Sequence, residues 1–377
     1  MCNSFMLFCA LNTVKGMFIK MNKTDWFHDR KWGCFFHYLY GKAGYTAESK
    51  FQPEVSWNEC VNAFNVEAFA KQMDELKAGY VFITLMQGRK YMCAPNDTFN
   101  KITGEKPGEA CSERDLIMEL ADELAKYDIP LMVYFTGDGP WLDEKCGPAM
   151  GYHDRFNEVV TEKFVKNWTS VLKEYAIRYG DKVKGWWIDG CCNFFGYNED
   201  LLKYYRDAVN AGNKNALLAL NNGVYWIDLD NPEFKPLYEG ETHPYKINDI
   251  VCRKYQEGDE LAMRAIPRPG PKRYSQYEDF TAGEEMDFIF YPEERFTDGA
   301  QWHILSFLGQ NTNGGGRFSS YGWGNYGSKY SGKEMRDYVD KVNEKGGVVT
   351  IEAACFRDGS MDAAQIEVLK YLKSCRD

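Results

Sequence analysis

The sequence lacks several features that would point to common classes of function. Its 377 residues include only five histidines, no Cys-x-x-Cys pair, and no His-Glu-x-x-His motif, phosphate-binding loop or dinucleotide fingerprint. Lys and Arg number 45 against 55 Asp and Glu, so the net charge of −10 favours neither nucleic acid nor an anionic lipid surface. It also lacks the run of about 18 apolar residues that a membrane-spanning helix needs. We therefore expect no metal, no cofactor, no nucleic-acid partner and no membrane partner, and the sequence leaves the oligomeric state open.

The first 24 residues carry no clear targeting signal. The apolar patch Phe5–Leu11 is short, has no Lys or Arg before it, and is followed by no small-x-small cleavage site. Met17 and Met21 are both plausible alternative starts. We expect residues 1–24 to be an N-terminal extension that need not be ordered, and the protein to be cytoplasmic, with export left open.

The twelve cysteines are scattered, and no histidine lies at a zinc-ligand spacing from two of them. In a chain of this length, scattered cysteines usually act as small buried apolar residues in a reducing compartment. Cys191 and Cys192 are notable only because they follow a candidate catalytic residue.

What the sequence does contain is an alternation of short apolar runs and amphipathic stretches. The apolar runs predict strands at 32–38, 80–85, 130–136, 183–189, 216–220, 278–281, 303–308 and 348–353. Apolar residues at helical spacing predict helices at 64–77, 112–124, 156–179, 198–211, 331–345 and 362–373. This alternation predicts an α/β fold, a (β/α)8 TIM-type barrel forming one catalytic domain over 25–377. Six prolines between 222 and 275 predict a long irregular insertion there.

Enzymes with this barrel place their chemistry at the C-terminal ends of the strands. Asp189 ends the run Val183–Asp189, behind Trp186 and Trp187, of which at most one can face the barrel interior. An Asp at a strand end is either a reactive group or an organiser of the following loop. Further polar residues fall at the predicted strand ends, namely His37, Gln87, Asp138, Asn221, Asn222 and, less directly, Glu284.

Acidic residues on the later loops offer partners for Asp189. They are Glu239, Glu241, Glu278, Asp279, Glu284 and Glu285. A strand-end Asp with a partner Glu fits glycoside hydrolysis, which uses two carboxyl groups. The aromatic content of 16% fits as well, because aromatic rings stack on the C–H faces of sugars.

Six segments, in the right order, resemble the α-L-fucosidases of glycoside hydrolase family 29. They are residues 25–37, 64–83, 114–136, 178–190, 278–284 and 342–361. The resemblance implies that Asp189 is the nucleophile, that Glu284 is the acid/base with Glu241 as its alternate, and that His37 binds a sugar hydroxyl. We place the other substrate-binding residues at Trp57, Gln87, Tyr134, Trp141, Trp187, Trp302 and His303. The β-sandwich that often follows the barrel in this family has no room in this chain.

The sequence departs from that family at three strand ends. Met86, Gln87 and Gly88 stand where the family has Lys-His-His-Asp-Gly, Tyr38 replaces a Trp, and Asn221 and Asn222 stand where an Arg is expected. A site that loses groups for specific hydroxyls loses discrimination, so the sugar can differ from α-L-fucose. Two alternatives to a retaining exo-glycosidase stay open. One is a carbohydrate-binding pseudoenzyme, and the other is a metal-dependent barrel hydrolase using Asp189, His37 and His303.

Overall fold

The computed structural model describes residues 22–40, 55–224, 227–266, 270–310 and 322–376. Most of the expected N-terminal extension, residues 1–21, lies outside the described residues, as do 311–321 beyond the predicted seventh strand. No helix in the described ranges is long and apolar enough to cross a membrane.

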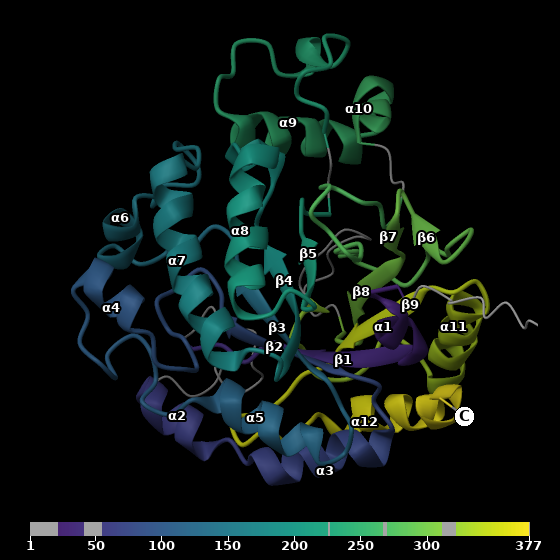
Figure 1. Ribbon diagram of the computed structural model, residues 1–377. Helices are drawn as coiled ribbons and strands as arrows, with labels where there is room; N and C mark the ends of the chain where they lie inside the picture. The colour runs from purple at the N-terminus through teal and green to yellow at the C-terminus, as the bar shows by residue number, and fades with distance from the viewer. Residues whose placement is uncertain (1–21, 41–54, 225–226, 267–269, 311–321, 377) are drawn as a thin grey trace, which may run out of the picture.

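Seven parallel strands form one curled sheet in the order β5-β4-β3-β2-β1-β9-β8 (Figure 1). They are β1 (Trp32–Phe36), β2 (Val81–Met86), β3 (Leu131–Thr136), β4 (Val183–Asp189), β5 (Leu217–Leu220), β8 (His303–Phe307) and β9 (Val348–Glu352). Six of them are buried at every position, as expected for parallel strands covered on both faces. A separate antiparallel pair consists of β6 (Phe296–Thr297) and β7 (Ala300–Gln301).

Helices surround the outer face of this sheet (Figure 1). They are α2 (Trp57–Ala63), α3 (Val66–Leu76), α4 (Asp97–Thr103), α5 (Leu116–Ala125), α6 (Cys146–Met150), α7 (Glu162–Tyr179), α8 (Glu199–Gly212), α11 (Gly332–Glu344) and α12 (Ala363–Leu369). The short helix α1 (Asp25–Asp29) differs, because its Phe27 packs against Tyr80 and Phe280 inside the curl of the sheet. Two helices begin later than their apolar pattern predicted. Asp115, rather than Ser112, caps α5, and Thr161 caps α7, because their side-chain oxygens accept the free N–H groups of the first turn.

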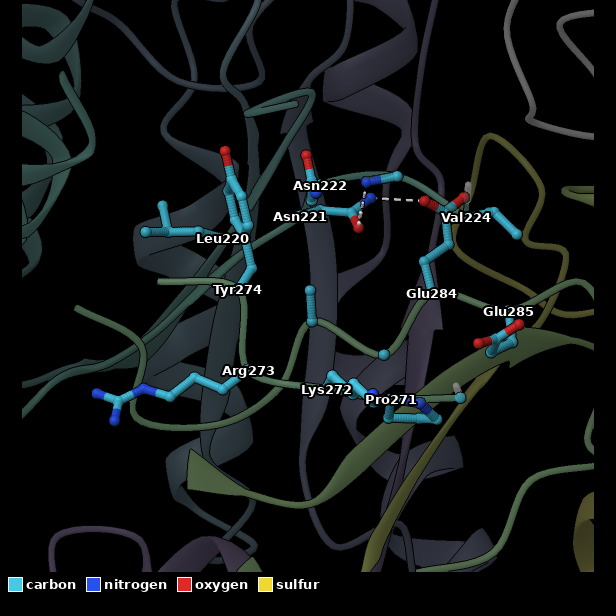
Figure 2. A pocket seen from close by; sticks show the side chains of 14 residues that line it. Leu220, Asn221, Asn222, Val224, Pro271, Lys272, Arg273, Tyr274, Glu284 and Glu285 are labelled. Atoms are coloured by element: carbon cyan, nitrogen blue, oxygen red, sulfur yellow. Dashed lines mark hydrogen bonds between the residues drawn. The ribbon is translucent and has the colours of Figure 1, made fainter. Parts of the chain in front are cut away.

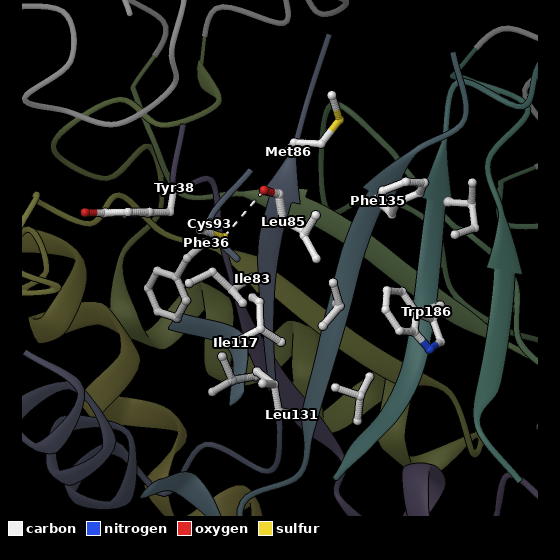
Figure 3. Packing of buried hydrophobic residues seen from close by; sticks show 14 of the residues in the cluster. Phe36, Tyr38, Ile83, Leu85, Met86, Cys93, Ile117, Leu131, Phe135 and Trp186 are labelled. Carbon is white, nitrogen blue, oxygen red and sulfur yellow. Dashed lines mark hydrogen bonds between the residues drawn. The ribbon is translucent and has the colours of Figure 1, made fainter. Parts of the chain in front are cut away.

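Two apolar cores follow from the alternation of side chains along the strands. The outer core lies between the sheet and the helices, where Ile83, Phe135 and Trp186 meet Ile117 of α5 (Figure 3). The inner core lies inside the curl of the sheet and contains Phe35, Phe82, Tyr134, Trp187 and Leu305. Trp186 and Trp187 therefore face opposite sides of β4, as the strand pattern requires.

The sheet does not close with eight regular strands. The predicted sixth strand, 278–281, is not a regular strand: Phe280 makes an isolated bridge to Gln301 of β7, and Glu284, just beyond the segment, makes one to Leu305 of β8. Two carboxylates take the place of backbone carbonyls along β5, because Asp279 accepts the N–H of Leu218 and Glu278 accepts that of Leu220. Regular pairing along β5 is thereby interrupted, which a pattern of apolar residues could not reveal.

The region predicted to be an irregular insertion contains two helices. They are α9 (Pro244–Gln256) and α10 (Glu260–Ala265), which lie together at one end of the molecule (Figure 1). Pro244 is the first residue of α9, a position where a missing N–H costs nothing. This segment has its own apolar cluster, formed by Ile227, Phe234, Leu237, Ile247, Val251, Ala262, Ala265 and Ile266. The count of prolines was therefore a poor guide to its regularity.

Candidate active site

Asp189 stands at the end of β4 and accepts hydrogen bonds from three side chains. The Tyr134 hydroxyl donates to Oδ2 over 2.6 Å, Asn221 Nδ2 donates to Oδ1 over 2.7 Å, and Gln87 Nε2 lies 3.5 Å from Oδ2. The sheet register fixes this group, because Tyr134 pairs with Trp187 and Thr136 pairs with Asp189 on the neighbouring strand. Trp187 and Asp189 are two residues apart, so both side chains face the interior of the sheet.

Glu284 faces Asp189 across the same opening. It lies on the irregular segment between β5 and β8, and Asn221 Nδ2 donates to its Oε2 over 2.5 Å (Figure 2). One amide nitrogen thus bridges both carboxyl groups, so Asp189 Oδ1 and Glu284 Oε2 lie within about 5 Å of each other. This bound on the nearest oxygens is compatible with the carboxyl separation of about 5–5.5 Å in retaining glycosidases.

The environment of Glu284 keeps a proton on it at neutral pH. Burial, and then the nearby negative charge of Asp189, raise the pKa of Glu284 to about 8, while the hydrogen bond from Asn221 opposes the shift. A carboxylic acid that is protonated at pH 7 beside a second carboxyl group is an arrangement suited to general acid catalysis.

A small cavity, here called the inner pocket, opens beside the two carboxyl groups. Its volume is about 90 Å³, and its lining is Phe35, His37, Gln87, Tyr134, Trp187, Asp189, Glu284, Leu305 and Trp323. Such a volume corresponds to about three water molecules at liquid density. Tyr134 stacks on Trp187 with ring centroids 5.3 Å apart, and His37 meets the ring of Trp323 at 5.5 Å.

His37 is oriented by a carboxylate at the end of β9. Its Nδ1 lies 3.2 Å from Glu352 Oε1, which also accepts the backbone N–H of Gly324 over 2.8 Å. Glu352 is fully buried, so this pair fixes the ring at the floor of the inner pocket. A histidine held in this way can direct its other ring nitrogen to a ligand hydroxyl.

A larger cavity, the outer pocket, lies next to the inner pocket and shares Gln87, Asp189 and Glu284 with it. It has a volume of about 380 Å³ and is lined by loops that follow the strands. Arg155 dominates one wall: its Nη1 donates to Asp138 Oδ2 over 3.0 Å, and its guanidinium lies over the rings of Trp141 and Phe195 at 4.5 and 4.3 Å. Burial raises the pKa of Asp138 to about 6, although the charge of Arg155 opposes this shift.

A third cavity, the side pocket, reaches Glu284 from the direction of β5 (Figure 2). Its volume is about 220 Å³, and it lies between residues 220–224, 270–274 and 282–285. Two polar atoms at its lining, Asn222 Nδ2 and the Tyr274 hydroxyl, are buried without a hydrogen-bond partner among the described residues. Glu284 therefore lines the inner, outer and side pockets.

The structure brings together six of the residues singled out from the sequence. Asp189, Glu284, His37, Gln87, Tyr134 and Trp187 all line the inner pocket. Trp141 lines the outer pocket. Their roles toward a substrate stay predictions, but their convergence on one cavity is a fact of the fold.

Four other predicted residues lie away from these pockets. Trp57 donates to the Met92 carbonyl within the outer core, Trp302 is buried beside Gly347, and Glu241 is exposed on the loop before α9. His303 is the first residue of β8, where its ring lies 2.8 Å from the Thr281 carbonyl and 2.6 Å from Thr350 Oγ1. Burial lowers the pKa of His303 to about 4, so it is a neutral interior residue. Asp189, His37 and His303 do not gather, and within the described ranges no cluster of three His, Cys, Asp or Glu suits a metal ion.

Sequence reasoning missed three residues that shape the site and the role of a fourth. Glu352 ends an apolar strand, so the rule that selected Asp189 also applied to it. Asn221 was noted at a strand end and as the loss of an arginine, but not as the amide that bridges the two carboxyl groups. Trp323 and Arg155 lie on loops, and no spacing in the sequence indicated that they would reach a pocket.

Comparison with known proteins shows the fold. The chain matches no protein-family model and no curated protein sequence. Among solved structures, it resembles the endo-fucoidan hydrolase MfFcnA4 of glycoside hydrolase family 107, with 14% identity, a TM-score of 0.55, and coverage of 94% of this chain and 53% of the other. The chain thus spans about half the length of that protein.

Two fucosidase structures give similar values. A trapped covalent intermediate of a family 29 α-L-fucosidase from Bacteroides thetaiotaomicron has 14% identity and a TM-score of 0.55, with 94% of this chain and 74% of the other covered. The α-L-fucosidase AlfC, in complex with Fucα(1,6)GlcNAc, has 13% identity and a TM-score of 0.55, with 94% and 97% covered. At these identities the likeness establishes a shared barrel-like α/β architecture.

Proposed function

We propose that the chain is a retaining glycosidase that removes a terminal fucose or a closely related sugar. The observation that carries this proposal is the pair Asp189 and Glu284, bridged by one amide nitrogen where the inner and outer pockets meet. The fold likeness to fucosidases and a fucoidan hydrolase supports it. So does the motif resemblance to family 29.

The reaction needs two steps. In the first, an Asp189 oxygen bonds to the anomeric carbon while the glycosidic C–O bond breaks, and Glu284 gives its proton to the leaving oxygen. In the second, the Glu284 carboxylate takes a proton from water, the water oxygen bonds to the anomeric carbon, and Asp189 is released. Glu284 starts protonated because its pKa is about 8.

The other groups would bind the sugar and hold the pair. Tyr134 and Asn221 fix the Asp189 carboxylate through the two shortest hydrogen bonds that it accepts. His37, oriented by Glu352, would donate to or accept from a sugar hydroxyl, and Trp187 and Trp323 would face apolar C–H groups of the ring. Departures at Gln87 and Asn221 from the family pattern leave the choice of sugar to experiment.

The experiment is a hydrolysis screen on aryl glycosides of fucose, galactose, arabinose and quinovose. On the preferred sugar, we expect Asp189→Asn to lower kcat/KM by at least about 10³-fold. Azide added to Glu284→Ala should give a glycosyl azide of retained configuration, because azide replaces water in the second step. Full activity of Asp189→Asn would refute the proposal, and glycan binding by the wild-type protein without turnover on any sugar would indicate a binding protein instead.

A further inference from the structure

Arg89 is a cation at the active-site mouth that forms no ion pair with a carboxylate among the described residues. It lies on the loop after β2, lines the outer pocket with Asp189 and Glu284, and has a buried Nε without a hydrogen-bond partner among the described residues. Its neighbour in the chain shows the contrast. Lys90 Nζ lies 3.3 Å from Glu105 and 3.9 Å from Asp143, so that cation is paired on two sides.

The other charged groups of the outer pocket each have a hydrogen-bond partner among the described residues. Arg155 donates to Asp138, and Glu284 holds a proton at neutral pH because its pKa is about 8. Asp189 accepts its hydrogen bonds from Tyr134, Asn221 and Gln87, with none from Arg89. Among the described lining residues, Arg89 is therefore the cation that a ligand would have to satisfy.

Arg89 also lies on the leaving-group side of the carboxyl pair. It lines the outer pocket and not the inner pocket, and the loop that carries it packs against the loop of Trp141, since Leu142 N–H donates to the Gly88 carbonyl over 2.8 Å. Trp141 supplies a ring face on which a sugar can stack. A guanidinium beside such a face is suited to an anionic substituent on that same sugar, because its forked N–H groups match two oxygens of one acid group.

We propose that the outer pocket binds a leaving-group sugar that carries an acidic substituent, a carboxylate or a sulfate ester, and that Arg89 is the residue that pairs with it. This inference rests on the proposed function and adds the class of the second sugar. A neutral sugar would offer no opposite charge to the Arg89 guanidinium, whereas an acid group would form charge-assisted hydrogen bonds with it. Acidic leaving sugars are consequently preferred over neutral ones.

The test compares four glycosides that share the preferred terminal sugar and differ only at the leaving sugar. These leaving sugars are galactose, galactose 6-sulfate, galacturonate, and the methyl ester of galacturonate as a neutral match in shape. We expect kcat/KM to be at least about tenfold higher for one or both acidic forms than for their neutral matches, with the difference reduced by added salt. The two acidic arms identify which acid group the pocket accepts.

Variants then assign the preference to Arg89. Arg89→Gln should reduce the ratio of acidic to neutral kcat/KM to near one, and Arg89→Lys should keep part of it because the charge remains. Arg253→Gln is the matched control, since Arg253 lies on α9 and pairs with Asp249 outside the three pockets. The inference is overturned if wild-type and Arg89→Gln hydrolyse acidic and neutral glycosides with the same ratio.

A binding measurement separates this inference from the proposed function. Titration of galacturonate and galactose 6-sulfate into the Asp189→Asn protein should show binding that Arg89→Gln removes in the double variant. Binding of this kind, together with no turnover of any glycoside by the wild-type protein, would refute the glycosidase proposal and keep the acidic-sugar site. Hydrolysis by the wild-type protein with no preference that depends on Arg89 would keep the glycosidase proposal and refute the acidic-sugar site.

Discussion

The inner and outer pockets meet at the same two carboxyl groups but are built in different ways. The walls of the inner pocket come mainly from β1, β3, β4 and β8, and they are aromatic or uncharged apart from the two carboxyl groups. The outer pocket is formed by loops and carries Arg89, Asp138 and Arg155. The register of the parallel strands fixes which side chains line the inner pocket. The sequences of the loops decide which side chains line the outer pocket. This contrast suggests a constant reaction on one sugar and an adjustable choice of the group that leaves.

Glu284 stands on the boundary between the pockets, so its replacement gives the largest effect among the tests of this comparison. We expect Glu284→Gln to lower kcat/KM by about 10²–10⁴-fold for glycosides with a sugar leaving group, because the leaving oxygen then lacks a proton donor. In the wild type, activity should fall above pH 8, where Glu284, with a pKa of about 8, loses its proton. A pH-rate profile of both proteins measures this.

The control for Glu284 is a leaving group that needs no proton. With a dinitrophenyl glycoside, the first step of Glu284→Gln should approach the wild-type rate, because the departing phenolate is stable. Asp189→Asn should stay inactive on the same compound. Equal losses of Glu284→Gln on dinitrophenyl and sugar leaving groups would contradict the role of a general acid.

A matched pair of tryptophans tests the two pockets separately. Trp323→Ala removes a wall of the inner pocket, so we expect kcat/KM to fall about tenfold or more on every glycoside of the preferred sugar. Trp141→Ala removes a wall of the outer pocket, so a loss of similar size should appear with sugar leaving groups and not with small aryl ones. Identical substrate profiles for the two variants would remove the distinction between the pockets.

The same contrast explains what the sequence could predict. Strands at 32–38, 183–189 and 348–353 were evident from uninterrupted apolar runs, and the strand-end rule selected Asp189 and His37. Most of the residues that line the inner pocket therefore came within reach of sequence reasoning. Their position depends on register within a parallel sheet, which is regular.

Residues that depend on irregular backbone were not predictable in this way. Carboxylates of Glu278 and Asp279 replace carbonyls along β5, which no apolar pattern records, so the sixth strand was wrongly expected. Trp302 and His303 lie at the N-terminal end of β8, away from the site at the C-terminal ends of the strands. The apolar run 303–308 predicted a strand, but it did not show which end of that strand faces the pocket. Arg155 reaches the outer pocket through a long loop, and only coordinates show such a path.

The two buried glutamates Glu284 and Glu278 give the test with the smallest expected effect. Glu284 lines the inner pocket, whereas Glu278 hydrogen-bonds the backbone of the surrounding segments. Burial raises the pKa of both: Glu284 from 4.5 to about 8 and Glu278 from 4.5 to about 7. The folded state therefore binds more protons than the unfolded chain between pH 4.5 and these values, so stability should fall as pH rises through that window. Glu278 accepts the N–H groups of Leu220, Tyr274 and Ser275, whereas Glu284 accepts only the Asn221 amide in the described structure.

Replacement by glutamine should therefore stabilise the protein at one position and destabilise it at the other, each at its own pH. Glu284→Gln removes a carboxyl group whose ionisation is disfavoured, so its melting temperature at pH 8.5 should exceed that of the wild type by about 2–4 °C, with little difference at pH 5. Glu278→Gln keeps one acceptor oxygen for three N–H groups, so it should be less stable at pH 5 by about 1–3 kcal/mol. Thermal and urea unfolding at both pH values measure these changes. If the Glu284→Gln protein is less stable than the wild type at pH 8.5, the carboxyl group of Glu284 stabilises the folded state. The expectation that its ionisation destabilises the folded state would then be wrong.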